Sequence, residues 1–317
     1  MYSLIVPVYK NEANIPPLIE AIQSIKGNLD GPFEAVFVVD GSPDNSMLVL
    51  RNQLTSVTGS FQLISLSRNF GSFSAIRAGM KAARGEFMAV MAADLQEPPE
   101  LVLRMFAALR NDECDVVVGE RIKRNDPVLA RSSSGLFWWL YRKVVFKELP
   151  SGGVDIFGCN GKVRDQLVAL TERYSSLIGQ LFWIGFRRKS LPYERSKRTI
   201  GRSAWTFAKK WNYLLDSIYS FSDLPIVLLV RTGFIGLAFS IIFGGIVFVG
   251  ALSHRISVPG YAATVLVVVF FGMLNLLALG VIGIYVSRAF ENTKARPTFI
   301  LSSHELFENG EQTKVLK

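Results

Sequence analysis

The chain has 317 residues, of which 50% are hydrophobic and 19% are charged, and its formal net charge is +9. This composition excludes an intrinsically disordered protein, and the presence of only two cysteines excludes a disulfide scaffold. The positive charge indicates a polyanionic partner, such as nucleic acid, an anionic membrane surface or a phosphorylated substrate.

The first 190 residues alternate short apolar runs with helical patterns. Strands are predicted at residues 3–7, 35–39, 62–66, 87–91 and 115–119. Helices are predicted at residues 15–24, 46–54, 74–83 and 100–110. Such alternation predicts an α/β sandwich with a largely parallel sheet. The apolar N-terminal run is too short for a signal segment, so it is interpreted as the first strand.

A carboxylate follows three of the predicted strands. Glu12 comes after the first strand, Asp40 after the second and Asp94 after the fourth. One such residue would usually be a helix cap, but ligands of parallel sheets bind at this edge. Three of them in a basic protein therefore indicate a Mg²⁺ or Mn²⁺ ion that bridges carboxylates to substrate phosphates. Neither a G-x-G-x-x-G nor a Walker A pattern occurs, which argues against dinucleotide-binding and P-loop proteins.

Two aromatic and basic segments, residues 131–147 and 203–225, are typical of helices in the headgroup region of a membrane. The alternative is that both are ordinary surface helices that pack on the core.

Two uncharged stretches near the C-terminus are long enough to cross a bilayer. Residues 232–253 and 256–287 contain no charged side chain. At about 1.5 Å per residue the first spans about 33 Å, against a bilayer core of about 30 Å. We therefore predict a transmembrane hairpin, with a pair of buried core helices as the alternative. Its connection carries only Arg255, so the positive-inside rule predicts that both termini are cytoplasmic.

Four motifs carry a family resemblance. They are P-x-Y-x-x-E at 7–12, V-D-G-S-x-D-x-S at 39–46, S-R-N-F-G at 67–71 and A-D-L-Q-E-P-P-E at 93–100. Together they resemble the inverting family 2 glycosyltransferases, and more closely those that use a polyisoprenyl phosphate. The resemblance implies a GT-A fold, a Rossmann-like mixed sheet, followed by a two-helix transmembrane hairpin. It also implies inverting transfer of a sugar from a nucleotide-diphosphate sugar to polyprenyl (undecaprenyl) phosphate, for cell-envelope glycan or lipopolysaccharide modification.

The same resemblance implies a role for particular residues. The donor would be bound by Pro7, Tyr9, Glu12, Asp40, Ser42 and Asp94. The residues expected at the divalent metal are Asp94 and Gln96, and those expected to act in catalysis are Asp155 and Asp94. The acceptor and the phosphates would be bound by Arg121, Arg131, Ser134, Arg198, Arg202 and Ser203.

Three positions depart from the family pattern. Ala92 replaces the first Asp of the D-x-D segment, Ala204 replaces a Lys, and Phe157 replaces an Arg. The lost carboxylate weakens the expected metal site, and the departures leave the sugar and the nucleotide open. Two alternatives therefore stay open: a catalytically weak membrane scaffold, and a membrane glycosyltransferase with another lipid or glycan acceptor.

The expected organisation has four parts. These are a cytoplasmic catalytic domain (1–200), a juxtamembrane helical region (201–228), two transmembrane helices (229–290) and a cytoplasmic tail (291–317). The protein would be a multi-pass protein of the bacterial inner membrane. Its expected partners are the nucleotide sugar, polyprenyl phosphate, membrane lipids, a flippase for the product and a further copy of the chain. Nucleic acid is not expected, because it would account for the charge but not for the hairpin.

Overall fold

The computed structural model describes residues 1–122, 141–143, 145–146, 148–150, 153–172, 175–196, 207–252 and 260–316. Five residues expected to bind the acceptor or phosphates lie outside the described residues: Arg131, Ser134, Arg198, Arg202 and Ser203.

A nine-stranded sheet forms the centre of the described protein, in the order β7-β5-β6-β4-β1-β2-β3-β8-β9. The strands are β1 (Tyr2–Val8), β2 (Phe33–Val39), β3 (Ser60–Leu66), β4 (Phe87–Val90), β5 (Val116–Arg121), β6 (Phe157–Asn160), β7 (Arg188–Tyr193), β8 (Leu301–Glu308) and β9 (Glu311–Leu316). The four central strands, β4-β1-β2-β3, are parallel. β6 runs antiparallel to both β4 and β5, and β8 runs antiparallel to β3.

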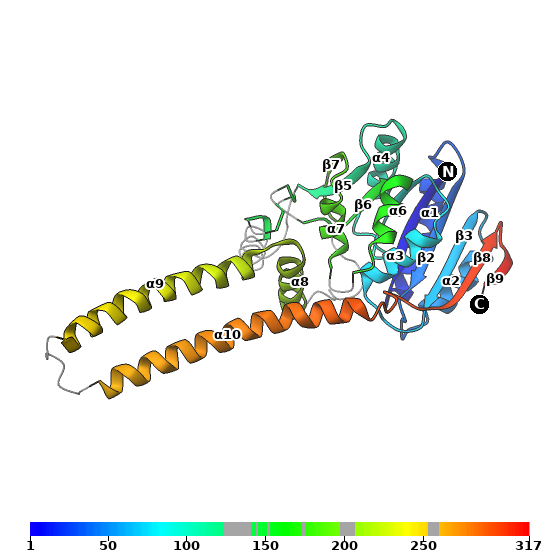
Figure 1. The fold of residues 1–317 in the computed structure, drawn as a ribbon. Helices are drawn as coiled ribbons and strands as arrows, with labels where there is room; N and C mark the ends of the chain where they lie inside the picture. Colours follow the sequence, from blue (N-terminus) through cyan, green and yellow to red (C-terminus); the bar gives the residue numbers. More distant parts are fainter. Residues whose placement is uncertain are drawn as a thin grey trace.

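Helices cover both faces of this sheet (Figure 1). They are α1 (Ile15–Gly27), α2 (Ser46–Leu54), α3 (Ser72–Ala82), α4 (Pro99–Arg110), α6 (Gly161–Ala169), α7 (Leu177–Trp183) and α8 (Phe207–Phe221), with a 3₁₀ turn, η1 (Glu12–Asn14), before α1. Side chains alternate along β1, so that Leu4 and Val6 pack with α1, α2 and α4, and Ile5 packs with α3, α6 and α7. Because both faces are buried, the central strands are almost continuously apolar.

The predicted fold class is confirmed: the chain forms a mixed α/β sheet followed by two apolar helices. All five predicted strands and all four predicted helices of the first half are present, with ends shifted by a few residues. The sheet is less parallel than the pattern suggested. The antiparallel strands were not predicted, because β6 (FGCN) and β8 (LSSHELFE) lack a regular run or alternation of apolar residues.

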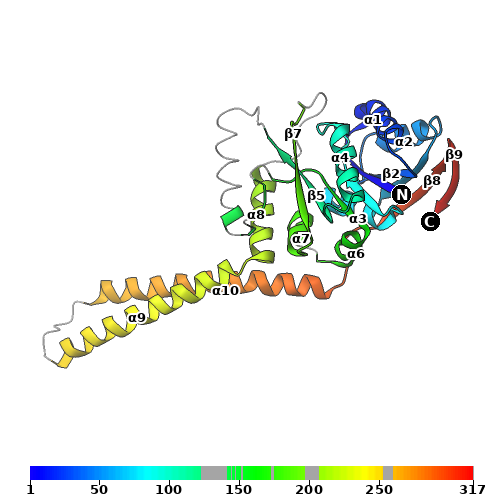
Figure 2. The same cartoon turned by 90° about the horizontal axis from the view of Figure 1, so that it is seen from above.

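Two long apolar helices, α9 (Leu224–Leu252) and α10 (Tyr261–Thr293), leave the sheet side by side (Figure 1), and Figure 2 shows the same pair from above. Both are long and apolar enough to cross a membrane, and their most apolar windows are entirely unburied. Side chains such as Phe234, Ile235 and Leu276 are each about 70% exposed. The alternative of buried core helices therefore does not describe them.

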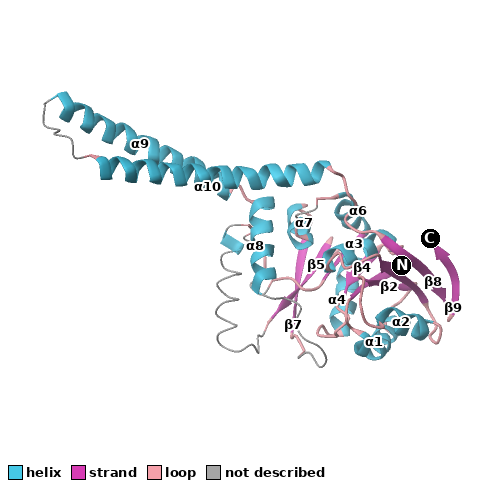
Figure 3. Ribbon diagram, turned by 90° about the horizontal axis from the view of Figure 1, so that it is seen from below, coloured by secondary structure: helices cyan, strands magenta, loops and turns pink. Residues whose placement is uncertain are grey.

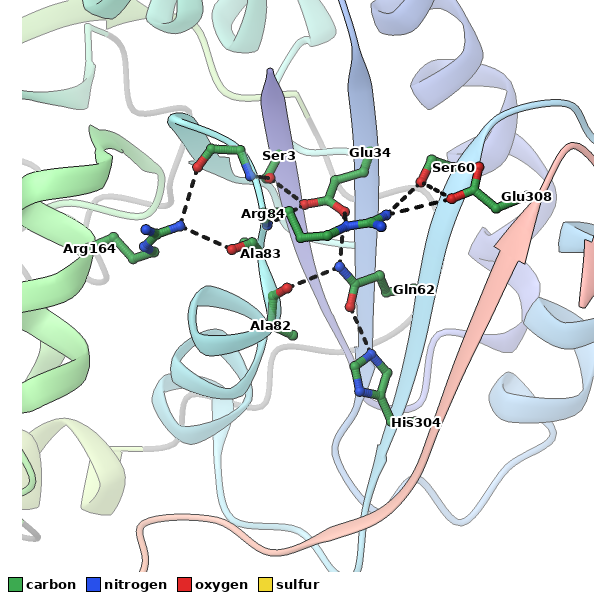
Figure 4. A network of polar contacts seen from close by, with 11 residues as sticks. Ser3, Glu34, Ser60, Gln62, Ala82, Ala83, Arg84, Arg164, His304 and Glu308 are labelled. Atoms are coloured by element: carbon green, nitrogen blue, oxygen red, sulfur yellow. Dashed lines mark hydrogen bonds and ion pairs between the residues drawn. The ribbon is translucent and has the colours of Figure 1, made fainter. Parts of the chain in front are cut away.

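The residues after α10 return to the sheet, where β8 and β9 form one edge (Figure 3). A polar network joins this edge to the interior (Figure 4). The His304 ring contacts Oε1 of Gln62 at 2.7 Å, and Gln62 donates to Glu34 at 2.9 Å. Burial raises the pKa of Glu34, but hydrogen bonds from Ser3, Arg84 and Gln62 together outweigh it and leave that pKa lowered. The network stabilises a charged group inside the sheet.

Candidate active site

A cleft of about 1520 Å³ opens at the carboxyl ends of β1, β2, β3 and β4. At this end it is lined by Pro7, Tyr9, Asp40, Asp94 and the loop 68–74. Its wall continues onto α8 and onto the segment that follows α10, through Asn212, Tyr213, Asp216, Arg296, Pro297, Thr298 and Ile300. One cavity therefore joins the strand ends to α8 and to the segment that follows the second apolar helix.

The loops after β1 and β2 bind each other. The Lys10 backbone amide donates to Oγ of Ser42 at 2.8 Å, and the Glu12 amide donates to Oδ2 of Asp44 at 3.2 Å. In return the Glu12 carboxylate accepts from the Asn45 amide at 3.0 Å. Glu12 and Ser42 thus shape the loops beneath Tyr9, and neither is among the described residues that line the cleft.

Asp40 anchors the S-R-N-F-G loop to the end of β2. Its two carboxylate oxygens accept from the backbone amides of Phe70 (2.7 Å) and Gly71 (2.8 Å). The side chain is buried, and burial raises the pKa of Asp40 despite these two hydrogen bonds. The next residue, Gly41, has φ +56°, and a Cβ there would lie 2.3 Å from the carbonyl carbon of Arg68. Asp-Gly at this position allows the loop to approach closely enough to form one wall of the cleft.

Asp94 and Gln96 follow β4, but their side chains have different surroundings. Asp94 lines the cleft, and its Oδ1 accepts from the Gln96 amide at 3.4 Å. Between them Leu95 takes a left-handed backbone conformation, φ +53°, which is uncommon for a branched side chain. The Gln96 side chain is buried: its Oε1 accepts from Nη2 of Arg195 at 2.5 Å, and its Nε2 donates to the Ser196 carbonyl at 3.3 Å. The oxygen predicted to bind a metal is here bound to a guanidinium.

Two other predicted residues, Arg121 and Asp155, form an ion pair with each other. Tyr193 also donates to Oδ2 of Asp155 at 3.2 Å, and Nη1 of Arg195 lies 3.8 Å from that oxygen. This cluster is connected to Asp94 through Gln96 and Arg195. Neither Asp155 nor Arg121 is among the described residues that line the cleft.

Glu97 was missed by sequence reasoning. It is 1% exposed, and neither of its carboxylate oxygens has a hydrogen-bond partner among the described residues. Burial, followed by the nearby charges of Asp155 and Asp94, raises the pKa of Glu97 to about 7. Its place in A-D-L-Q-E-P-P-E was the available signal, but an acid just before a helix is ordinarily interpreted as favourable to the helix dipole. No local signal distinguished Tyr193, the last residue of β7, or Arg195, which lies two residues after the strand.

The side chains at the cleft supply only part of the ligands that a divalent metal needs. No group of three or more His, Cys, Asp or Glu side chains in the described part of the chain is arranged to hold a metal ion. The cleft offers the Asp94 carboxylate at the end of β4. Mg²⁺ is usually held by one or two carboxylates, substrate phosphates and water. These residues therefore fit a metal that substrate phosphates would help to bind.

Comparison with known proteins gives consistent sequence matches. The sequence model described as Glycosyl transferase family 2 matches residues 3–170. CsbB of Bacillus subtilis (strain 168), a protein named as a glycosyltransferase, is 33% identical over 95% of this chain and 91% of its own. The bactoprenol glucosyl transferase of Shigella phage SfX is 28% identical over 96% of this chain and 99% of its own.

Among solved structures, glucosyl-3-phosphoglycerate synthase from Mycobacterium tuberculosis, crystallised with Mn²⁺, UDP and phosphoglyceric acid, aligns with a TM-score of 0.44. The alignment has 18% identity over 63% of this chain and 72% of that chain.

Proposed function

The chain belongs to glycosyltransferase family 2 and transfers a glycosyl group from a nucleotide sugar, and we propose that its acceptor is a polyprenyl phosphate, such as undecaprenyl phosphate. The full-length similarity to a bactoprenol glucosyl transferase supports this acceptor. The product would serve the modification of cell-envelope glycan or lipopolysaccharide.

The cleft carries this proposal, because it extends from the strand ends to α8 and to the segment that follows α10. A nucleotide sugar is water-soluble, whereas a polyprenyl tail must stay in the bilayer. A transferase for this pair needs one cavity that receives the donor from water and a phosphate from the membrane surface. The lining residues Tyr9 and Asp94 lie at one end, and Asn212 and Asp216 of α8 lie at the other.

The proposed reaction needs little proton transfer. A phosphate monoester has a second pKa near 6, so the acceptor is largely a dianion at neutral pH. One of its oxygens attacks the anomeric carbon while the bond from that carbon to the nucleoside diphosphate breaks, which inverts the configuration. This agrees with a chain whose first 253 residues contain no histidine.

Charge stabilisation is then the main task of the site, because a nucleoside diphosphate leaves. A divalent metal, when bound, would neutralise part of that charge, and Asp94 is the residue that we propose would hold it with the diphosphate. Gln96 would join it only after releasing Arg195, to which it is hydrogen-bonded. We assign Arg121 and Arg195 to phosphate binding and Asp155 to positioning of the acceptor, since Asp155 holds both guanidinium groups in one cluster.

We also propose that α9 and α10 span the bacterial inner membrane as a hairpin, with both ends of the chain in the cytoplasm. β1 and β8 belong to one sheet, so the two ends of the chain lie on the same side of any membrane that the hairpin crosses. The division into four segments, the flippase and self-association stay predictions.

The test is direct synthesis. Purified full-length protein in detergent receives undecaprenyl phosphate and a panel of sugar nucleotides, with Mg²⁺, with Mn²⁺ or with EDTA, and the lipid is analysed by mass spectrometry. We expect a glycosylated lipid with one donor, and loss of product in EDTA. Sugar-nucleotide turnover onto another acceptor would overturn the acceptor assignment, and no turnover by folded, lipid-bound protein would favour a scaffold.

A further inference from the structure

We propose that Arg296, which follows the second apolar helix, is a phosphate-binding residue of the substrate cleft. The inference deepens the proposed function, because both substrates of that reaction carry phosphate. Basic residues that flank an apolar hairpin are otherwise explained by the positive-inside rule.

The backbone holds the Arg296 segment against the cleft. α10 ends at Thr293, and Ala295 turns the chain with φ +47°. The Ser67 amide then donates to the Ile300 carbonyl at 2.9 Å, just before Leu301 pairs with Leu66 at the start of β8. Both ends of the segment are thus fixed, one by the helix and one by the sheet, and Arg296 lines the cleft between them.

Three basic residues near the end of α10 differ in their partners. Arg288 forms an ion pair with Asp216 at 2.6 Å, and Lys294 forms one with Glu291. No ion pair joins Arg296 to any carboxylate in the described part of the chain, and its side chain is exposed in the cleft wall. Among the described residues, Arg296 is therefore a cation of the cleft wall that no carboxylate neutralises by an ion pair.

The neighbouring charges favour an anion there. Arg68 lines the same cleft, stacked 4.0 Å from the centre of the Phe70 ring. Four carboxylates also line the cleft: Asp40, Asp94, Glu172 and Asp216. Asp40 has both oxygens bound to backbone amides, and Asp216 is paired with Arg288. Glu172 accepts from Nε2 of Gln180 at 3.1 Å, and Asp94 accepts from the Gln96 amide. A planar guanidinium binds two phosphate oxygens at once, which a lysine cannot do. The structure thus favours a phosphate as the partner of Arg296, from either the donor or the lipid.

Binding measurements on the full-length protein in detergent test this proposal without requiring turnover. Nucleoside diphosphates with Mg²⁺ are titrated by calorimetry, and undecaprenyl phosphate is titrated by native mass spectrometry. The variants are Arg296→Gln, Arg296→Lys and, as the matched control, Lys294→Gln. We expect Arg296→Gln to weaken one of the two ligands roughly ten- to hundredfold, as for loss of a charged hydrogen bond. Arg296→Lys should recover part of that loss, and Lys294→Gln should bind like wild type.

The two arms identify the source of the phosphate. Weaker nucleotide binding alone assigns Arg296 to the donor, and weaker lipid binding alone assigns it to the acceptor. The proposal is overturned if both affinities of Arg296→Gln stay within twofold of wild type, or if Lys294→Gln loses as much. If wild type fails to glycosylate the lipid but Arg296→Gln still loses nucleotide affinity, the proposed acceptor fails and the role of Arg296 stands.

Discussion

Two buried acids beside the cleft show how the surroundings of a carboxylate decide its role. Asp40 accepts two backbone hydrogen bonds, whereas Glu97 accepts none among the described residues. Both belong to the motifs that identify the family. Asp40 holds a loop in place, whereas Glu97 is a buried carboxyl whose ionised form destabilises the native state. Their substitutions should therefore change stability in opposite directions.

Replacement of Glu97 by Gln should remove a pH-dependent loss of stability. Because the pKa of Glu97 is raised to about 7, the native state binds more protons than the unfolded state between about pH 4.5 and 7. Stability therefore falls as pH rises through that window, by roughly 3 kcal/mol in total. In thermal unfolding with EDTA, we expect Glu97→Gln to match wild type near pH 5 and to melt roughly 5 °C higher at pH 8.

The control is Glu100→Gln, which changes an exposed acid of the same motif. Its melting temperature should keep a constant difference from that of wild type between pH 5 and 8, because removing an acid from the first turn of α4 costs at most about 1 kcal/mol. A Glu97→Gln profile that stays parallel to wild type from pH 5 to 8 would contradict the assignment of a raised pKa to this carboxyl.

Replacement of Asp40 by Ala should destabilise the protein. The change removes two charge-assisted hydrogen bonds and leaves the Phe70 and Gly71 amides without them. We expect a loss of about 2–4 kcal/mol in the free energy of unfolding, together with weaker nucleotide binding because the loop loses its anchor. Denaturant unfolding measures the first and calorimetry the second. Asp30→Ala, at a side chain that is 97% exposed, should change neither, and an equal effect of both variants would refute the anchoring role.

At the level of elements, α8 packs on α7 rather than lying apart from the helices that surround the sheet. A Cβ on Gly179 of α7 would lie 2.3 Å from the Phe221 ring of α8. The Ser176 hydroxyl caps α7 and contacts the Tyr213 hydroxyl at 3.0 Å, and the Tyr141 and Tyr213 rings stack at 5.7 Å. These contacts fix α8, and with it the end of the cleft at which we propose that the lipid phosphate binds, against α7. Trp211 of α8 is half-exposed, which agrees with the prediction that this helix also lies at the membrane surface.

Replacement of Gly179 by Ala should destabilise the protein, although Gly→Ala substitutions within helices usually stabilise. Glycine to alanine in a helix ordinarily stabilises by about 0.5–1 kcal/mol, but overpacking costs about 1–3 kcal/mol. We expect Gly179→Ala to lower the melting temperature. In the double variant Gly179→Ala/Phe221→Ala, the loss of stability should be smaller than the sum of the losses in the two single variants. Gly161→Ala in α6, where the nearest atoms lie at ordinary contact distances, is the control. Additive losses in the double variant would show that the two residues do not interfere.

At the scale of the whole molecule, one sheet contains strands from both ends of the chain, and the apolar hairpin projects from it. The β8 strand is held by its hydrogen bonds to β3 and also by an ion pair. Glu305 of β8 forms a bidentate ion pair with Arg51 of α2 at 2.8 and 2.5 Å. The segment after the hairpin is therefore built into the same sheet as the N-terminal strands.

This architecture predicts that the far end of the hairpin and the C-terminal strands lie on opposite sides of the membrane. Both native cysteines are buried, so an added cysteine can be labelled selectively. In inside-out vesicles, we expect Gln312→Cys to react with an impermeant maleimide and Gly260→Cys to react only after detergent is added. Both positions are exposed in the structure. Equal labelling of the two in intact vesicles would show that the hairpin does not cross.

The sequence by itself determined the elements of the first half, the apolar helices and the family, because hydrophobic periodicity and short motifs are local. It also placed Asp40 and Asp94 at strand ends, where the structure has them. Only the tertiary structure decided which polar groups bind one another. Three such contacts join segments that are distant in the sequence. They are the hydrogen bond of Gln96 to Arg195, the ion pair of Arg121 with Asp155, and the position of Arg296 in the cleft wall. Such pairings arise from strand order and loop packing, and a local pattern of residue types carries no information about either.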